Sequence, residues 1–150
     1  MNYYPIFLDL RSKPVLVVGG GKVATRKVKG LLEAQAHVTV VAPVISNDLR
    51  ETAAITLVER EYQSCDCPGH ALIFAATSSR EVNAQIARDA RAQSIPSNVA
   101  DAPEECAFIV PARLSDGIIQ IAVSTGGTDP RRAVAIRDSI RRALPAILSV

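Results

Sequence analysis

The sequence contains no tryptophan, and aromatic residues make up only 4% of its 150 positions. Hydrophobic residues nevertheless make up 48%, so the core that this chain builds must be mainly aliphatic. Cysteine is scarce as well, and the odd number formed by Cys65, Cys67 and Cys106 argues against a disulfide framework. The length fits one domain with at most a small appendage.

The sequence also lacks an excess of charge of one sign, long apolar runs and a targeting segment. The 17 basic and 15 acidic residues give a net charge of +2, and no basic run with interleaved aromatic residues occurs. This balance argues against a nucleic-acid-binding surface. No apolar run approaches the ~20 residues of a membrane-spanning helix, and the N-terminus lacks the basic and apolar regions of a signal peptide. We therefore expect a cytoplasmic protein with neither nucleic-acid nor membrane partners.

A glycine-rich segment near the N-terminus carries the strongest functional signal. Residues 14–18 form an apolar run that predicts a strand, and Gly19, Gly20 and Gly21 follow it directly before a predicted helix. Gly19, Gly21 and Ala24 match the dinucleotide-binding pattern G-x-G-x-x-A. Such glycines permit a tight turn and the close approach of a pyrophosphate, and the helix N-terminus adds free N–H groups. The segment predicts a dinucleotide cofactor.

Apolar strand patterns and amphipathic helix patterns alternate after this point. Strands are predicted at residues 14–18, 37–41, 56–59, 71–75 and 96–99, and helices at residues 22–34, 47–52 and 80–93. This alternation predicts an α/β fold with a Rossmann-type, doubly wound parallel sheet.

The C-terminal part has a different pattern. Strands at residues 108–112 and 118–124 enclose the turn signal Asp116-Gly117, and a helix over residues 131–144, begun by Asp129 and Pro130, is expected to end at Pro145. We therefore assign residues 1–112 to the dinucleotide-binding Rossmann domain and residues 113–150 to a small α+β dimerisation extension.

A hairpin leaves a strand edge that invites pairing with another chain. The last helix adds an apolar stripe of Ile136, Ile140 and Leu144. Both features predict a homodimer.

The expected ribose-binding acid is missing. About 20 residues after the glycines, where this acid usually lies, the sequence has Val40, Val41, Ala42 and Pro43. No arginine is present there for a 2′-phosphate, so these residues do not separate NAD from NADP. Either the backbone at residues 42–44 contacts the adenosine, or the Rossmann-like fold binds another ligand.

Two further strand ends are expected at the rim where such folds bind ligands. Small residues around Thr77 would allow the close approach of a nicotinamide, although close packing explains them equally well. Asp101 follows the fifth predicted strand. Its carboxylate can accept a proton while a hydride leaves a substrate; the alternative is an aspartate that caps a turn.

Two other clusters contain residues that could bind a ligand. Ser124, Thr125, Gly126 and Gly127 form a second glycine loop before a helix, which either cradles a substrate carboxylate on its amides or is a simple turn. Cys65, Cys67 and His70 do not complete a tetrahedral metal site, so no metal site is predicted.

Taken together, the motifs resemble the siroheme-synthase dehydrogenase family, whose members are precorrin-2 dehydrogenases, some also sirohydrochlorin ferrochelatases. The resembling segments are residues 4–8, 17–27, 38–43, 75–77 with 82–83, 98–103, 108–112 and 122–130.

The resemblance implies NAD-dependent oxidation of precorrin-2 to sirohydrochlorin in siroheme biosynthesis, with Fe²⁺ insertion into the product as a further activity. It implies that Asp101 is the general acid/base and that the glycine loop, Lys22, Val23, Pro43 and Val44 contact NAD. It also implies that the C-terminal region joins two protomers. The alternatives are a non-catalytic NAD-sensing domain and a chelatase that uses no NAD, against which the intact glycine loop argues.

Overall fold

The computed structural model describes residues 3–148. The chain forms two compact units. The first spans Ile6–Phe108, and the second joins the N-terminal residues up to Pro5 with the chain from Ile109 onward.

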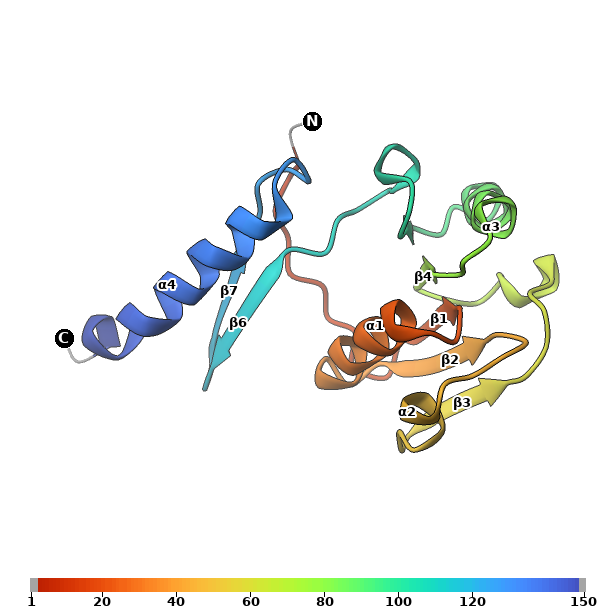
Figure 1. The fold of residues 1–150 in the computed structure, drawn as a ribbon, viewed down its shortest axis with the longest axis horizontal. Helices are drawn as coiled ribbons and strands as arrows, with labels where there is room; N and C mark the ends of the chain where they lie inside the picture. The colour runs from red at the N-terminus through yellow and green to blue at the C-terminus, as the bar shows by residue number, and fades with distance from the viewer. Residues whose placement is uncertain (1–2, 149–150) are drawn as a thin grey trace. The chain divides into compact units, whose positions relative to one another are not determined.

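The first unit is an α/β fold with a five-stranded parallel sheet, as predicted (Figure 1). Its elements in chain order are β1 (Pro14–Val18), α1 (Lys22–Glu33), β2 (His37–Val41), α2 (Asn47–Arg50), β3 (Ile55–Val58), η1 (Ser64–Asp66), β4 (Leu72–Ala75), α3 (Arg80–Ala92), β5 (Ser97–Val99) and η2 (Pro103–Glu105). The strand order is β3-β2-β1-β4-β5. The order changes direction between β1 and β4, and in such sheets the ligand crevice lies at this point, outside the carboxyl ends of the strands.

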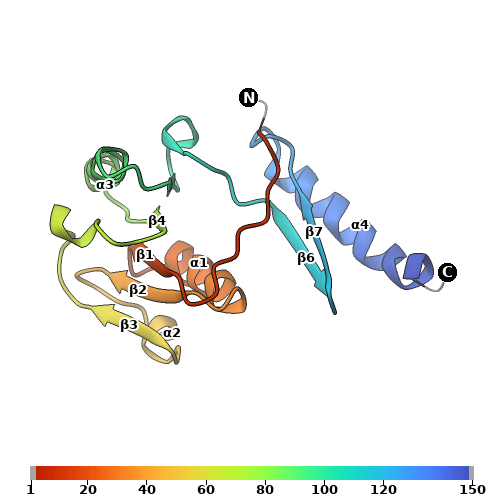
Figure 2. The same ribbon diagram turned by 180° about the vertical axis from the view of Figure 1, so that it is seen from behind.

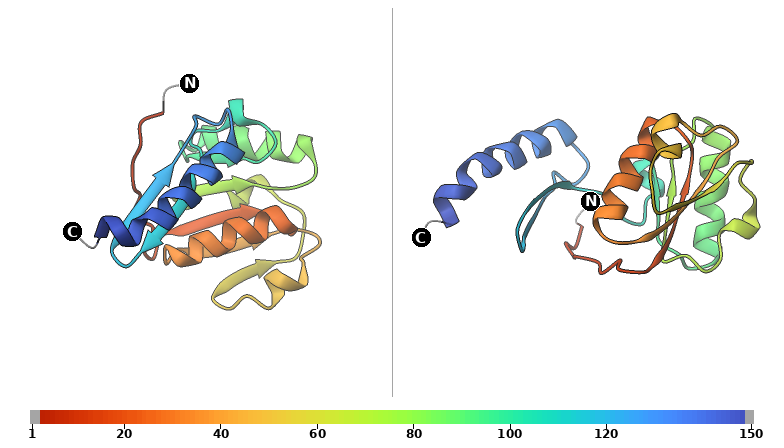
Figure 3. Two further views of the ribbon diagram at one scale, coloured as in Figure 1. Left: turned by 60° about the vertical axis from the view of Figure 1, so that its left-hand side comes forward. Right: turned by 90° about the horizontal axis from the view of Figure 1, so that it is seen from below.

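Helices cover both faces of this sheet, α1 and α2 one face and α3 the other (Figure 3). Successive side chains of a strand point to opposite faces. Val15 and Val17 of β1 accordingly pack in the cluster of α1, whereas Leu16 and Val18 pack in the cluster of α3. Burial on both faces explains why β1 is a continuous apolar run rather than an alternating one.

In the second unit a β-hairpin packs against the last helix (Figure 2). The hairpin consists of β6 (Ala112–Asp116) and β7 (Ile119–Val123), and the helix is α4 (Pro130–Leu148). Leu144 of the predicted apolar stripe is buried, whereas Ile136 is 39% exposed. None of the helices in residues 3–148 is long and apolar enough to span a membrane.

The strand predicted at residues 108–112 is wrong, because the paired strand begins only at Ala112. The apolar residue that prompted the prediction, Phe108, belongs to the first unit, where its ring meets that of Phe74 edge-on at 5.5 Å. Asp116 pairs with Ile119, so the turn consists of Gly117 and its successor instead of residues 113–117. Gly117 has a φ of +56°, which suits glycine at the first position of a two-residue hairpin turn.

The expected end of the last helix at Pro145 is also wrong. α4 continues through Pro145 to Leu148. A proline inside a helix forfeits the bond from its own nitrogen to the carbonyl four residues earlier. Pro145 lies in the last turn of α4, so the lost bond affects only the C-terminal end of the helix.

Candidate active site

The first two glycines of the glycine loop are required by the fold itself. Gly19 is buried and has a φ of +131°, and a side chain there would collide with the carbonyl oxygen of Ala76. A side chain at Gly20 would collide with the carbonyl oxygen of Val44. The loop after β1 is therefore in close contact with the loops that follow β2 and β4.

Gly21 differs from these two glycines. It is exposed, and a Cβ atom added to it would meet no protein atom within 4 Å. It is also the N-cap of α1, and no side chain caps this helix end or adds an acid to its first turn. The first N–H groups of a helix are anion-binding donors when nothing else occupies them. The open space at Gly21 and the uncapped N-terminus of α1 therefore fit the pyrophosphate of a dinucleotide.

The other residues expected at the cofactor surround this loop. Lys22 and Val23 form the exposed start of α1. Pro43 and Val44 follow β2, and the side chain of Val44 is 78% exposed even though its carbonyl lies against Gly20. The structure thus brings these residues, expected to contact NAD, to one end of the sheet.

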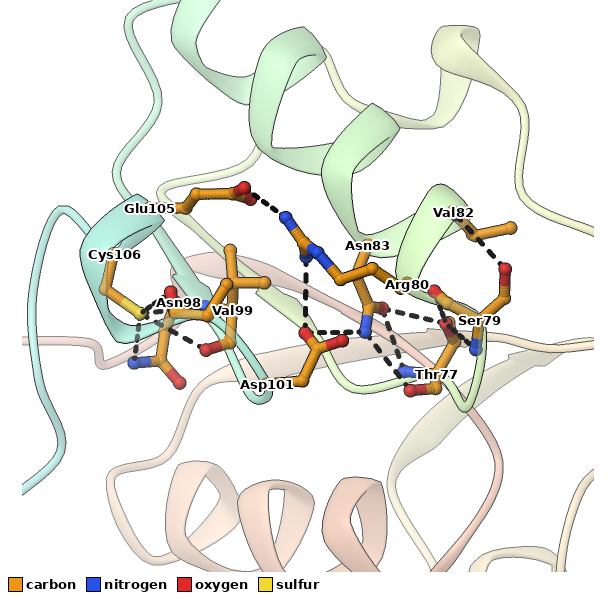
Figure 4. A network of polar contacts seen from close by, with 11 residues as sticks. Thr77, Ser79, Arg80, Val82, Asn83, Asn98, Val99, Asp101, Glu105 and Cys106 are labelled. Carbon is orange, nitrogen blue, oxygen red and sulfur yellow. Dashed lines mark hydrogen bonds and ion pairs between the residues drawn. The ribbon is translucent and has the colours of Figure 1, made fainter.

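Thr77 follows β4, where the N–H of Ala76 donates to the carbonyl oxygen of Val18 at 2.8 Å. The polar groups of Thr77 form hydrogen bonds with residues at the start of α3 (Figure 4). Its hydroxyl lies 2.8 Å from Oδ1 of Asn83 and 3.0 Å from the carbonyl oxygen of Ser79. These bonds fix the path of the chain between β4 and α3.

Asn83 lies at the centre of a polar network in which Asp101 also takes part (Figure 4). Its side chain is fully buried in the first turns of α3. Its Nδ2 donates to the carbonyl oxygen of Thr77 at 3.2 Å and to Oδ1 of Asp101 at 3.0 Å. A single amide therefore connects the end of β4 with the turn after β5.

The carboxylate of Asp101 is held from one side only. Nη1 of Arg80 lies 3.4 Å from the same Oδ1 that Asn83 contacts, and the other end of that guanidinium pairs with Glu105. Within the described residues Oδ2 has no hydrogen-bond partner, and the side chain is 39% exposed. The carboxylate of Glu105, and to a smaller degree those of Asp101 and Glu104, raises the pKa of Arg80. One oxygen of Asp101 is thus fixed and the other is available to a ligand.

A partly buried lysine, Lys27, lies on the α1 side of the sheet. Its Nζ donates to Oδ1 of Asn98 at 2.9 Å and lies 5.2 Å from the centre of the Phe74 ring. Burial, and then the nearby Arg26, lowers its pKa. Sequence reasoning assigned no role to this lysine, to Asn83 or to Arg80.

The second glycine loop belongs to the second unit. The N–H of Gly126 donates to the hydroxyl of Ser124 at 3.0 Å, and the N–H of Asp129 donates to that of Thr125 at 3.1 Å. Gly127 has a φ of +83° and open space beyond its α-carbon. Asp129 caps α4 through a 2.9 Å bond from the N–H of Arg132, as expected. The substrate-binding role of Ser124–Gly127 stays a prediction.

The cysteines are free thiols in three different environments. Cys65 is exposed and Cys67 is buried, and burial raises the pKa of the Cys67 thiol. Cys106 is half-buried, and its sulfur accepts a bond from the N–H of Val99 at 3.1 Å. No group of three or more histidine, cysteine or acidic side chains that could hold a metal ion occurs among residues 3–148.

Comparisons with known proteins agree on one family. Residues 6–112 match the family model described as "Putative NAD(P)-binding". The siroheme synthase of Methylococcus capsulatus is 44% identical over 149 residues, which cover 97% of this chain and 31% of that protein. The siroheme synthase of Ectopseudomonas mendocina is 45% identical over 147 residues, with 97% and 32% covered. This chain therefore spans about a third of the length of these relatives.

A solved structure supports the same family, and the match covers a larger share of that protein than of the siroheme synthases. SirC, a precorrin-2 dehydrogenase, matches with a TM-score of 0.81 and 31% sequence identity, over 93% of this chain and 70% of the SirC chain. With the glycine loop and the parallel sheet, these matches show that the chain belongs to the NAD(P)-binding family formed by SirC-like precorrin-2 dehydrogenases and the N-terminal modules of siroheme synthases.

Proposed function

We propose that this chain oxidises precorrin-2 to sirohydrochlorin, with NAD⁺ as the hydride acceptor. Family membership supports the reaction class. The observation that carries the proposal to individual residues is the carboxylate of Asp101, which lies just after β5 with one oxygen fixed and the other available. A general base needs this combination of a defined position and an accessible proton-accepting atom.

The oxidation removes two hydrogen atoms from the tetrapyrrole, one as a hydride and one as a proton. A bound NAD⁺ supplies the hydride acceptor. The glycine loop and the N-terminus of α1 would hold its pyrophosphate, Pro43 and Val44 would contact its adenosine, and Thr77 would contact its nicotinamide. Asp101 takes the proton on Oδ2, and Asn83 and Arg80 hold Oδ1.

The substrate is a tetrapyrrole that carries carboxylates. We assign Ser124, Thr125, Gly126 and Gly127 to the binding of one of these carboxylates. Fe²⁺ insertion into sirohydrochlorin, expected from the resemblance, would use the same base, because pyrrole N–H protons must also leave. Fe²⁺ is then a substrate rather than a resident metal.

An anaerobic assay with precorrin-2 tests this function. The purified chain is mixed with precorrin-2 and NAD⁺, and NADH and the sirohydrochlorin spectrum are followed together, with NADP⁺ in a parallel reaction. We expect NADH and sirohydrochlorin in equal amounts, and faster turnover with NAD⁺. Cofactor binding without turnover would instead support the non-catalytic NAD-sensing domain, and metal insertion without any need for NAD⁺ would support a chelatase.

A further inference from the structure

Asn83 uses every hydrogen-bonding position of its side chain. Its Oδ1 accepts from the N–H of Thr77 at 3.1 Å and from the Thr77 hydroxyl at 2.8 Å, and its Nδ2 donates to Thr77 and to Asp101 (Figure 4). A buried amide is stable only when such bonds are made. The network also identifies which atom of the amide is the oxygen and which is the nitrogen. A backbone N–H can only donate, so the atom that faces it is the oxygen, and the NH₂ group must point toward Asp101.

Asparagine is an unfavourable residue at this helical position, because its side chain competes with the backbone for hydrogen bonds. The N-terminus of α3 does not need it, since the hydroxyl of Ser79 already accepts from the N–H of Val82 at 3.3 Å. The bond from Asn83 to Asp101 joins residues 18 positions apart and ends on a partly exposed carboxylate. Capping and core packing therefore leave this bond unexplained.

We propose that Asn83 is a positioning residue for the oxidation: its amide fixes the carboxylate of Asp101 relative to Thr77, so that Oδ2 is free to accept the departing proton while Oδ1 stays bonded. This inference rests on the proposed function. Asn83 acts through Asp101 and touches neither substrate nor cofactor. Because the amide is neutral, it orients the carboxylate without adding a charge to it. The charged groups around this carboxylate are Arg80 on α3, which contacts it, and Glu104 and Glu105 on η2, which act on Arg80.

The main test is the substitution Asn83→Asp, which keeps the size of the side chain but replaces the NH₂ donor by an oxygen. Two carboxylates that share a site disfavour each other's charged form. We expect the acid limb of the pH profile of kcat to move upward by about one pH unit or more. We also expect kcat to fall while the KM for NAD⁺ stays close to that of the wild type.

Gln85→Glu is the matched control. It makes the same amide-to-carboxylate change on the same helix, and Gln85 also donates to an acid, Asp89, at 3.1 Å. This control should keep the wild-type acid limb. An Asn83→Asp chain that is active with an unmoved acid limb contradicts the positioning role.

A second measurement needs no substitution at Asn83 and no turnover. In the wild-type chain, the side-chain ¹⁵N resonance of Asn83 is followed as pH is lowered, and again in Asp101→Asn. We expect the resonance to titrate in the wild type and to stay constant in the variant. A resonance that does not respond in the wild type overturns the inference even if Asn83→Asp fails to fold. A wild-type chain that titrates in this way but does not oxidise precorrin-2 contradicts the proposed function, and with it the role in catalysis, while the contact itself stands.

Discussion

The backbone N–H of Ser46 donates to the carbonyl oxygen of Gly20 at 2.9 Å, which fastens the segment after β2 to the glycine loop after β1. The two hydroxyls of Ser46 and Thr25 lie 3.4 Å apart beneath the same loop. The middle glycine is thus fixed by protein contacts, whereas the next residue, Gly21, faces open space. The two positions should therefore respond differently to substitution.

We predict that Gly21→Asp abolishes NAD⁺ binding and leaves the fold intact. Gly21 has a φ of −100°, which any residue adopts, and aspartate is a good N-cap. Its thermal stability should match or exceed that of the wild type, while the new carboxylate repels the pyrophosphate. Isothermal titration with NAD⁺ and a thermal melt check both parts.

Two companion variants sharpen this prediction. Gly21→Asn adds a side chain of similar size without a charge and should retain more affinity than Gly21→Asp. Gly19→Ala should instead destabilise the chain, by about 2 kcal/mol or more, because it combines a collision with an unfavourable φ. Unchanged NAD⁺ affinity in Gly21→Asp would sink the cofactor assignment.

We predict that Asp101→Ala binds NAD⁺ and folds normally but loses dehydrogenase turnover by about 10²–10⁴-fold, the usual cost of removing a general base. The anaerobic precorrin-2 assay measures this loss. Asp48→Ala, which removes an exposed acid on α2, should retain the wild-type rate. If Asp101→Ala turns over at the wild-type rate, Asp101 is only a turn residue and another group or water is the base.

Much of the first unit could be predicted from the sequence, because its inner strands β1 and β4 are buried on both faces. β1 and β2 have the expected bounds, and the sequence of β1 is apolar from Pro14 to Val18, as is typical of a central parallel strand. The hairpin could not be placed correctly from the same signal. Phe108 packs on Phe74 in the first unit and not in a strand of the hairpin. The sequence alone does not show in which unit an apolar residue packs.

The candidate site shows the same limit. The glycine loop is recognisable because its turn and close backbone contacts require glycine. Asn83 is not, because its partners lie 6 and 18 positions away and a helical asparagine is usually solvent-exposed. Only the structure shows that this residue is fully buried and bonded to Asp101.

We predict that the chain is a homodimer at micromolar concentration, built from residues after about Arg113. Ile118 at the hairpin turn is fully exposed, and Val134 and Ile136 on α4 are about 40% exposed, which are apolar surfaces that a partner would cover. Sedimentation equilibrium gives the mass. Val134→Glu should weaken the association, whereas a wild-type chain that sediments as a monomer counts against the prediction.

We predict that the ion pair between Arg60 and Asp66 stabilises the first unit above acidic pH. The Arg60 guanidinium, aided by the N–H of Gln63, lowers the pKa of Asp66. A carboxyl whose pKa is lower in the folded state contributes stability above its unfolded pKa, and this contribution disappears as pH falls through the folded value. Since Arg60 is 38% exposed, solvent limits the effect of Asp66→Asn to about 1 kcal/mol or less.

Urea unfolding of wild type and Asp66→Asn checks this prediction at neutral pH and at about pH 3, below the unfolded pKa of an aspartate. The difference in unfolding free energy should be present at neutral pH and should shrink in acid. Thr56→Ala on β3, an exposed uncharged position, provides a control whose effect should not depend on pH. A difference for Asp66→Asn that stays constant with pH would show that the ion pair is not its source.

Because the three thiols have different environments, an alkylating reagent should react with them at different rates in the wild-type chain. Cys65 is exposed, Cys67 is buried with a raised pKa, and the sulfur of Cys106 is engaged by backbone groups. Because the thiolate is the reactive form and access limits its reaction, a maleimide dye should attach first to Cys65. Wild-type protein can therefore carry one fluorophore without any engineered cysteine, and the rotational diffusion of that dye would report self-association directly in dilute solution.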